Sequence, residues 1–247
     1  MFFLISIQKF FALFGLHVRR VAHGASIDSA LTEQIRFVGN EARMVFEVGA
    51  ADGRDSVSYL EYFPDAVLHA FEPNPQNFSK LAERGKAESR LSTNNVAVSN
   101  LAGKMPFHMT ALTDASSLLT PKKTDSAFDK YSEVENIVEV NVITLDEYCD
   151  KNGIEKIDLL KTDAQGSELN ILKGSQRLLR DQKIKVLYLE VLFMEIYEGA
   201  CLYHEVASLL ANHGYQLHSL YNLVHNQNGK LAWGDAIFLP AGTTNIV

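Results

Sequence analysis

The sequence predicts an α/β fold in which helices cover both faces of a seven-stranded, mostly parallel sheet that ends in an antiparallel hairpin. From Met44 onward, short apolar runs rich in β-branched and aromatic residues alternate with helical patterns, which is typical of such a sheet. With 247 residues and 47% hydrophobic content, the chain is long enough for one large core. No internal repeat or long linker divides it, so we expect a single domain at residues 25–247 behind an N-terminal segment at residues 1–24.

The first half of the domain contains three strand–helix steps. Strands are expected at residues 44–49, 67–72 and 91–98, and helices at residues 55–63 and 75–87. Pro75 suits the first helical position after Asn74 as the cap, because the N–H that proline lacks would have no partner there. Between residues 100 and 141 an insertion follows, with short strands at 105–109 and 136–143 around a Ser/Thr-rich loop. An insertion of this size is more often functional than idle.

The second half resumes the alternation. Thr144 and Glu147 form a capping box, which predicts a helix that ends near Gly153. Further strands are expected at residues 157–162, 185–192, 215–221 and 235–239, and helices at residues 167–180 and 204–212. Gly174 lies inside the first of these helices or breaks it. The turn-rich NQNGK between the last two strands predicts an antiparallel hairpin.

Composition limits the partners and the compartment. The net charge is −7, and residues 1–24 hold three basic and no acidic side chains, so the remainder is more acidic than the whole. An acidic body is a poor match for a nucleic-acid backbone, so we expect a small-molecule or carbohydrate partner and no nucleic acid. Cys149 and Cys201 are too few for a disulfide framework and lack metal-binding spacing. These features favour a reducing, cytoplasmic location.

Residues 1–20 are mostly apolar, but the run is interrupted by Lys9 and is too short to span a bilayer. Its positive charges follow the apolar part and no small-residue cleavage site ends it, which disfavours a signal peptide. Two interpretations stay open. The segment is a helix packed on the domain or on a partner chain in a homo-oligomer, or it lies in a membrane interface with Arg19 and Arg20 at the headgroups.

The stretch VFEVGAADGRDS, at residues 45–56, predicts the first ligand-binding loop. In an open α/β sheet the ligand lies outside the carboxyl ends of the strands, and Gly49 and Gly53 let the backbone approach it. The loop has G-x-x-x-G where a dinucleotide fingerprint requires G-x-G-x-x-G, and Asp52 would repel a pyrophosphate but attract a sulfonium. The loop therefore favours S-adenosyl-methionine over NAD. Glu72 stands where an acid accepts both ribose hydroxyls of an adenosine.

Six segments resemble the FkbM family of S-adenosyl-methionine-dependent methyltransferases: VFEVGAADGRDS, HAFEPNP, NVAVSN, VITLDEYC, DLLKTDAQGSELNILKGS and YLEVLFMEIYEG. The resemblance covers about residues 44–238, and LLKTDAQGSELNILKG is its most specific piece. It implies a Rossmann-like class I methyltransferase fold and methyl transfer to a hydroxyl oxygen of a sugar or natural product. By position it implies cofactor contacts at Glu47, Gly49, Ala50, Asp52, Gly53, Glu72, Asn95 and Val96. Gln165 departs from the Glu that the family commonly has, so no carboxylate role carries over to that position.

Asp163 and Glu190 lie at or near the ends of adjacent predicted strands, so we expect both carboxylates in one crevice. Methyl transfer to an alcohol requires an acceptor oxygen that is held in line with the leaving sulfur and that loses its proton. Asp163 is the expected base, or with Glu190 a ligand of Mg²⁺, which prefers oxygen ligands. Alternatively, Asp163 caps the next helix and Glu190 pairs with Lys161. Lys161 shares a strand face with Asp163 and is expected to orient the acid or the acceptor, and the insertion at 100–141 is expected to shape the acceptor site.

Other candidates surround these residues. Glu168 suits the stabilisation of its helix N-terminus through the dipole, and His108 is a second candidate base. Ser116 and Ser117 resemble a family feature near the active site, although a Ser/Thr-rich loop requires no such role. Tyr197 lines an acceptor pocket or packs in the core. Two other functions stay open at this point: an NAD-dependent oxidoreductase, and a non-catalytic cofactor-binding scaffold anchored by the N-terminal helix.

Overall fold

A computed structural model describes residues 29–123, 129 and 132–243. The strands form a seven-stranded sheet in the order β3-β2-β1-β7-β8-β10-β9 and a three-stranded sheet in the order β4-β6-β5. The larger sheet consists of β1 Met44–Val48, β2 Val67–Phe71, β3 Leu91–Asn94, β7 Ile157–Thr162, β8 Ile184–Leu192, β9 Tyr215–His225 and β10 Leu231–Pro240. β1, β2, β3, β7 and β8 are parallel, and β10 is antiparallel to β8 and β9. The predicted fold class is therefore confirmed.

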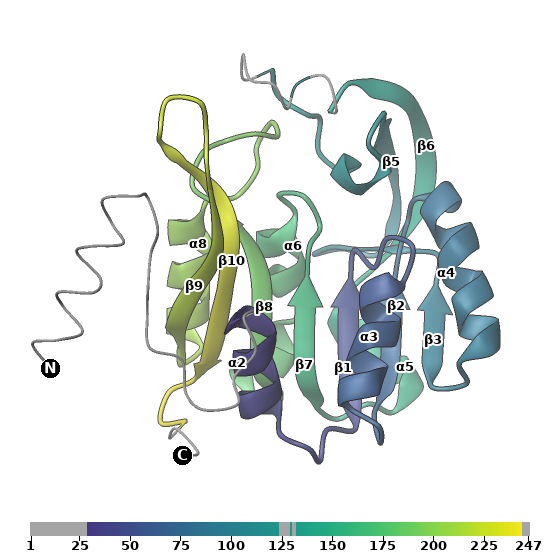
Figure 1. Cartoon of the computed structure of the whole chain (residues 1–247), viewed down its shortest axis with the longest axis vertical. Helices are drawn as coiled ribbons and strands as arrows, with labels where there is room; N and C mark the ends of the chain where they lie inside the picture. Colours follow the sequence, from purple (N-terminus) through teal and green to yellow (C-terminus); the bar gives the residue numbers. More distant parts are fainter. Residues whose placement is uncertain (1–28, 124–128, 130–131, 244–247) are drawn as a thin grey trace, which may run out of the picture.

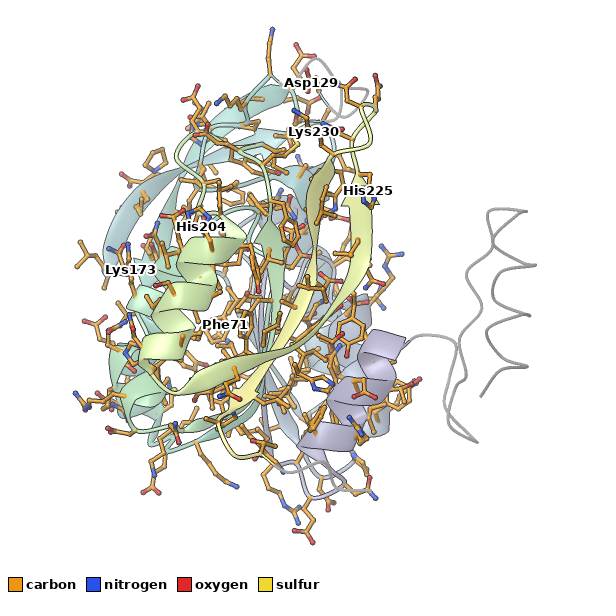
Figure 2. All side chains as sticks on the ribbon, turned by 90° about the vertical axis from the view of Figure 1, so that its left-hand side faces the viewer. Phe71, Asp129, Lys173, His204, His225 and Lys230 are labelled. Carbon is orange, nitrogen blue, oxygen red and sulfur yellow. The ribbon has the colours of Figure 1, made fainter. Side chains whose placement is uncertain are left out.

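Helices cover both faces of the larger sheet (Figure 1). One face carries α2 Ser29–Val38, α3 Arg54–Tyr62 and α4 Pro75–Ala87, and the other carries α5 Leu145–Asn152, α6 Glu168–Lys173, α7 Gln176–Arg180 and α8 Tyr203–Asn212. Figure 2 shows α2 and α8 on opposite sides of the β9–β10 hairpin. Successive side chains of a strand point to opposite faces. Val45 and Leu159 therefore join the core under α2–α4, and Phe46 and Leu160 the core under α5–α8.

Local sequence signals fix several helix ends as predicted. Asn74 Oδ1 accepts the N–H of Gln76 at 3.0 Å at the start of α4. Thr144 Oγ1 accepts the N–H of Glu147 at 3.1 Å, and Gly153 ends α5 with a left-handed φ of 66°. These signals act within one helical turn, so they can be found without knowledge of the tertiary structure.

The expected strand at residues 91–98 is wrong in one respect, because its two ends belong to different sheets. β3 ends at Asn94, and β4 Ala97–Val98 pairs in parallel with β6 Val134–Ile143 of the smaller sheet. Asn95 lies at the break, where its side-chain amide donates to the carbonyl oxygen of Glu72 at 2.8 Å. The second piece has only two residues, too few to show a pattern of its own, so the sequence did not reveal the change of sheet.

The expected helix at residues 167–180 is broken at Gly174 into α6 and α7. A Cβ on Gly174 would lie 2.1 Å from the carbonyl oxygen of Ser99, so glycine is required by the close approach of the chain after β4. The Asp146 carboxylate then holds the start of α7, where it accepts two backbone N–H groups at 2.8 and 3.1 Å. A long-range contact and a long-range cap therefore decide the break.

The insertion forms the smaller sheet and lies above the carboxyl ends of the parallel strands (Figure 1). β5 Gly103–Thr110 pairs with β6 in antiparallel register, and the short helix η1 Thr113–Ala115 follows β5. The expected N-terminal helix falls in residues 1–28, outside the described residues. Within the described residues, every helix is too short or too polar to cross a membrane.

We expect Gly174→Ala to destabilise the protein by about 3 kcal/mol, because the added methyl group forces the backbone near Ser99 to move. Gly153→Ala is the matched control. A Cβ there meets no atom within 4 Å, and only its left-handed backbone is strained, at a cost of about 1 kcal/mol. Urea unfolding measures both changes. An equal loss of stability in the two variants would contradict the close contact.

Candidate functional site

A cleft of about 400 Å³ lies at the carboxyl ends of the parallel strands, beneath the insertion. Its walls come from the loop after β1, the end of β2, β4 with the preceding Val96, the insertion, and the loop after β7. This is the edge at which open α/β sheets bind their ligands. The cleft therefore brings together the segments that the sequence assigned to cofactor and chemistry.

The predicted cofactor residues divide into two groups. Those that line the cleft are Gly49, Ala50, Asp52, Glu72 and Val96. The remaining three, Glu47, Gly53 and Asn95, lie behind its wall. They support the loops that face the cleft, a distinction that position along the chain does not reveal.

The two loop glycines are required by contacts within the protein. Both have a φ of 80°. A Cβ on Gly49 would lie 1.9 Å from the carbonyl oxygen of Asp163, and a Cβ on Gly53 would lie 2.6 Å from Cδ1 of Leu81. We predicted that these glycines let the backbone approach a ligand. The structure shows that they also let the loop after β1 pack against the loop after β7 and against α4, and Gly49 lines the cleft.

Glu72 is buried at the end of β2 and holds two turns of the cleft wall. Its Oε2 accepts the N–H of Ala51 at 2.8 Å, and its Oε1 accepts the N–H of Asn74 at 2.7 Å. Burial raises the pKa of Glu72 to about 8, although the two N–H groups lower it. Each carboxylate oxygen has a second lone pair, so Glu72 can still accept hydroxyl groups of a ligand.

Lys161 and Glu47 form a buried ion pair beneath the cleft. Lys161 Nζ lies 2.6 Å from Glu47 Oε1 and 2.8 Å from Asp55 Oδ2, and the Ser56 hydroxyl donates to the other oxygen of Glu47. Burial raises the pKa of Glu47 against the lowering effect of Lys161. Burial opposes the charge on Lys161 too, but the facing acids raise its pKa well above the usual value. Lys161 is thus a fixed ammonium group, paired with these acids and not with Glu190.

Gln165 joins the two carboxylates that were expected in one crevice. Its Nε2 donates to Asp163 Oδ1 at 2.7 Å and to Glu190 Oε2 at 3.3 Å, and its Oε1 lies 2.7 Å from the Tyr197 hydroxyl. The carboxylates of the adjacent strands lie on the same amide group, so Gln165 Nε2 bridges them where we expected Mg²⁺. Among the described residues, no group of three or more His, Cys, Asp and Glu side chains is arranged to hold a metal ion.

Asp163 and Glu190 differ in their access to a ligand. Asp163 is exposed and lines the cleft, whereas Glu190 is half-buried behind it. Although the Asp163 side chain is open to solvent, the protein that surrounds it in the cleft replaces part of its water and raises its pKa, as does Asp235, while Lys161 and the Gln165 amide lower it. Burial and the neighbouring Asp163 raise the pKa of Glu190 well above its usual value. Asp163 is therefore the carboxylate that a bound molecule can reach.

Three of the other candidates connect the loops around the cleft. Glu168 Oε1 accepts the N–H of Ala164 at 2.8 Å, ahead of α6. The Ser117 hydroxyl donates to the carbonyl oxygen of Gln165 at 2.8 Å, which ties the insertion to the loop after β7. Ser116 lines the cleft. The serines of the insertion therefore have a structural task at the site.

His108 and Tyr197 lie outside the cleft wall. His108 Nδ1 is buried and has no hydrogen-bond partner among the described residues. Tyr197 is fully buried and packs against Leu192 and Ile196. Tyr197 thus packs in the core, while its hydroxyl donates to Gln165 Oε1 and to the carbonyl oxygen of Ala115.

Sequence reasoning missed several residues of the cleft. Phe107 and Asp114 of the insertion line it, and so does Arg54 at the start of α3. Phe107 belongs to a strand that the sequence predicted, but nothing in a single strand pattern says which of its faces meets a cleft. For Asp114, the Ser/Thr-rich composition of the loop was the available signal.

The cleft has the chemical character that S-adenosyl-methionine requires. Asp55 and Asp163 lie on the β1–β7 side, and Phe71, Glu72 and Val96 lie on the β2–β3 side. Carboxylates favour a positively charged sulfur, and apolar walls favour an adenine base. Glu72 is placed to accept the ribose hydroxyls. The residues present therefore fit this cofactor.

We expect Lys161→Met to destabilise the protein by about 3–5 kcal/mol at pH 8, because it leaves the Glu47 carboxylate buried without its partner. Glu47 already has a pKa above 4.5, and loss of Lys161 raises it further. A carboxyl group whose pKa is higher in the folded than in the unfolded state costs more stability as pH rises above its unfolded value. The loss should therefore shrink toward pH 5.

Thermal unfolding at pH 5 and pH 8 measures this dependence. The double variant Lys161→Met with Glu47→Gln should recover most of the loss at pH 8, because it removes the buried charge. A loss that is the same at both pH values would contradict a buried, paired Glu47.

Comparison with known proteins identifies the family. The methyltransferase FkbM domain matches residues 47–217. The chain is 25% identical to the 2-O-methyltransferase NoeI of Sinorhizobium fredii, across 84% of this chain and 86% of that protein. It is 30% identical to the 31-O-demethyl-FK506 methyltransferase FkbM of Streptomyces tacrolimicus, across 70% of this chain and 72% of that protein.

Among solved structures, the chain is similar to magnesium protoporphyrin IX methyltransferase of Synechocystis. The match covers 96% of this chain and 96% of that chain, with 8% sequence identity and a TM-score of 0.48. The segment matched by the FkbM domain begins in β1 and ends in β9, so it contains the loops after β1, β2 and β7 that surround the cleft. The chain belongs to the FkbM family of S-adenosyl-methionine-dependent methyltransferases.

Proposed function

We propose that the protein methylates a hydroxyl oxygen of a sugar or small natural product, with Asp163 as the base. The position of Asp163 carries this proposal. Its carboxylate is exposed in the cofactor cleft at the end of β7, which β1 separates from the Glu72-bearing end of β2. The two relatives described above are named for oxygen methylation, which supports oxygen as the acceptor atom. Membership of a methyltransferase family leaves no support for the oxidoreductase alternative.

When bound, S-adenosyl-methionine supplies an electrophilic methyl group on a positively charged sulfur. The residues of the chain have separate tasks around it. Glu72 accepts ribose hydroxyls, and Asp55 contributes negative charge where the sulfonium is held. Asp163 accepts the proton of the acceptor hydroxyl. Because its Oδ1 already accepts the Gln165 N–H, its Oδ2 is the oxygen that receives this proton.

Asp163 is held in a defined orientation for this task. Gln165 binds its Oδ1, and the Tyr197 hydroxyl lies within hydrogen-bond distance of Gln165 Oε1. The pKa of Asp163 is raised toward neutral pH. A general base is most efficient when its pKa lies near the working pH. The ammonium group of Lys161, which Glu47 holds in place, lowers the pKa of Asp163 and so limits this increase. The arrangement thus combines a fixed position with a tuned proton affinity.

We expect Asp163→Asn to lower the rate of methyl transfer by about 10²–10⁴-fold, the usual effect of removing a general base. The dissociation constant of S-adenosyl-homocysteine should stay within about threefold, because Glu72 and the loop after β1 are intact. Asp181→Asn is the control, since Asp181 forms an ion pair with Arg180 on the surface away from the cleft.

The measurement is transfer of radiolabelled methyl groups to cell extract that has been separated into glycan, small-molecule, protein and nucleic-acid fractions, with and without EDTA. Undiminished transfer by Asp163→Asn would remove Asp163 from the chemistry. Label that enters protein or nucleic acid alone would reject the acceptor class.

We expect the affinity for S-adenosyl-homocysteine to rise with pH up to about 8. Ribose hydroxyls donate to an ionised carboxylate, but a pKa of about 8 keeps most of Glu72 protonated at pH 7 in the free protein. Binding then releases a proton, so the dissociation constant should fall by up to about tenfold per pH unit below pH 8. Above pH 8 it should level off.

Calorimetry between pH 6 and pH 9 measures this effect. Glu72→Gln should bind more weakly than the wild type at pH 9 and should lose the pH dependence. A wild-type dissociation constant that is the same across this range would show that Glu72 does not bind the ligand as a carboxylate.

A further inference from the structure

A second cavity adjoins the cofactor cleft on the α2–α3 face of the sheet. It has a volume of about 270 Å³ and is lined by residues of α2, α3, β7, β8 and β10. Asp55, Lys161 and Asp163 line both cavities. The two cavities therefore meet at these three side chains.

A methyl group can pass from a bound cofactor to a bound acceptor only where the two binding sites meet, because the reacting atoms must approach to about 3–3.5 Å. Asp163, the exposed carboxylate proposed as the base, lies at that border. Lys161 is occupied by Glu47 and Asp55. The second cavity thus leads to the base from the side opposite the cofactor cleft.

The insertion has a different place. We predicted that it shapes the acceptor site. Its residues Phe107, Asp114 and Leu118 line the cofactor cleft, and none of its described residues, at 100–123, 129 and 132–141, lines the second cavity. The insertion therefore encloses the cofactor cleft.

Fixed hydrogen bonds occupy two walls of the second cavity. The Tyr188 hydroxyl donates to Asp235 Oδ2 at 2.7 Å, and Asn222 Nδ2 donates to the same oxygen at 2.6 Å. Burial and the neighbouring Asp235 raise the pKa of Tyr188, so its hydroxyl keeps the proton that it donates. On the facing wall, the Tyr59 hydroxyl donates to Gln34 Oε1 at 2.6 Å. These bonds hold polar groups in place before a ligand arrives.

The charge in the second cavity selects its occupant. Asp163 and Asp235 supply carboxylates, whereas the ammonium group of Lys161 is paired with Asp55 and Glu47. Such a lining repels an anionic molecule and offers hydrogen-bond acceptors to hydroxyl groups. The rings of Tyr59 and Tyr188 add apolar surface. A volume of about 270 Å³ suits one small ring and not an extended chain.

We propose that this second cavity is the acceptor site and that it binds one neutral, polyhydroxylated ring, such as a single glycoside unit. Its reacting hydroxyl reaches Asp163, and another hydroxyl donates to Asp235. Tyr188 and Asp235 are thereby specificity-determining residues. This assignment rests on the proposed function, because it takes hydroxyl methylation as the reaction.

Ser58→Phe tests the location. Ser58 lines the second cavity from α3 and is not part of the cofactor cleft, so a phenyl ring there fills the cavity. Ser79→Phe, on the exposed side of α4, is the matched control. In the presence of S-adenosyl-homocysteine, saturation-transfer NMR measures the binding of the methyl glycosides of glucose, galactose, mannose, rhamnose and fucose.

We expect the wild type and Ser79→Phe to bind at least one of these glycosides, and Ser58→Phe to bind it at least about tenfold more weakly. The affinity for S-adenosyl-homocysteine, measured by calorimetry, should stay within about threefold in all three proteins. Glycoside binding that Ser58→Phe retains would place the acceptor elsewhere. Failure of every neutral glycoside to bind the wild type would also overturn the proposal.

Charged forms of the bound glycoside test the selectivity. The phosphorylated and the carboxylated form should bind at least about tenfold more weakly than the neutral glycoside. In Asp235→Asn, which removes one carboxylate from the lining, the ratio of the charged to the neutral dissociation constant should be smaller. Tighter binding of the aminated form would make the occupant an amine and overturn the proposal. These outcomes are independent of the proposed function, which fails instead if the wild type binds no S-adenosyl-homocysteine or transfers no methyl group to a hydroxyl.

Discussion

The buried contact between Lys161 and Glu47 is the interaction on which the site depends. It joins β7 to β1, and through Asp55 it reaches the start of α3. An ion pair removed from water is stable only when its geometry satisfies both groups, so these elements are held in one relative position. Lys161 and Asp55 line both cavities. The position of the proposed base relative to the cofactor cleft therefore follows from this ion pair.

The cleft is assembled from loops that share backbone contacts and not from independent side chains. Gly49 lets the loop after β1 reach the carbonyl oxygen of Asp163, and Glu72 binds the N–H groups of Ala51 and Asn74. Ser117 ties the insertion to the loop after β7. The loops around the cleft are therefore coupled through residues behind its wall as well as through those that face it.

The acidic groups have different environments and therefore different tasks. Glu47 is buried and paired, Glu72 is buried and bound by backbone N–H groups, and Asp163 is exposed in the cleft. Glu190, expected to act with Asp163, is half-buried and contacts it only through Gln165. The sequence places both acids at strand ends, but the depth of each side chain follows from how the strands and loops pack.

The sequence by itself determined the succession of strands and helices along the chain, the closing hairpin, the caps at Asn74 and Thr144, and the class of cofactor. These properties depend on periodicities and motifs within a few neighbouring residues. Only the tertiary structure decided that the expected strand at residues 91–98 is divided between two sheets and that Gly53 supports the loop after β1 from behind. It also decided that Tyr188 contacts Asp235. The last two residues are 47 positions apart, and the antiparallel pairing of β8 with β10 brings them together. Contacts of this kind depend on strand register and packing, which no local pattern contains.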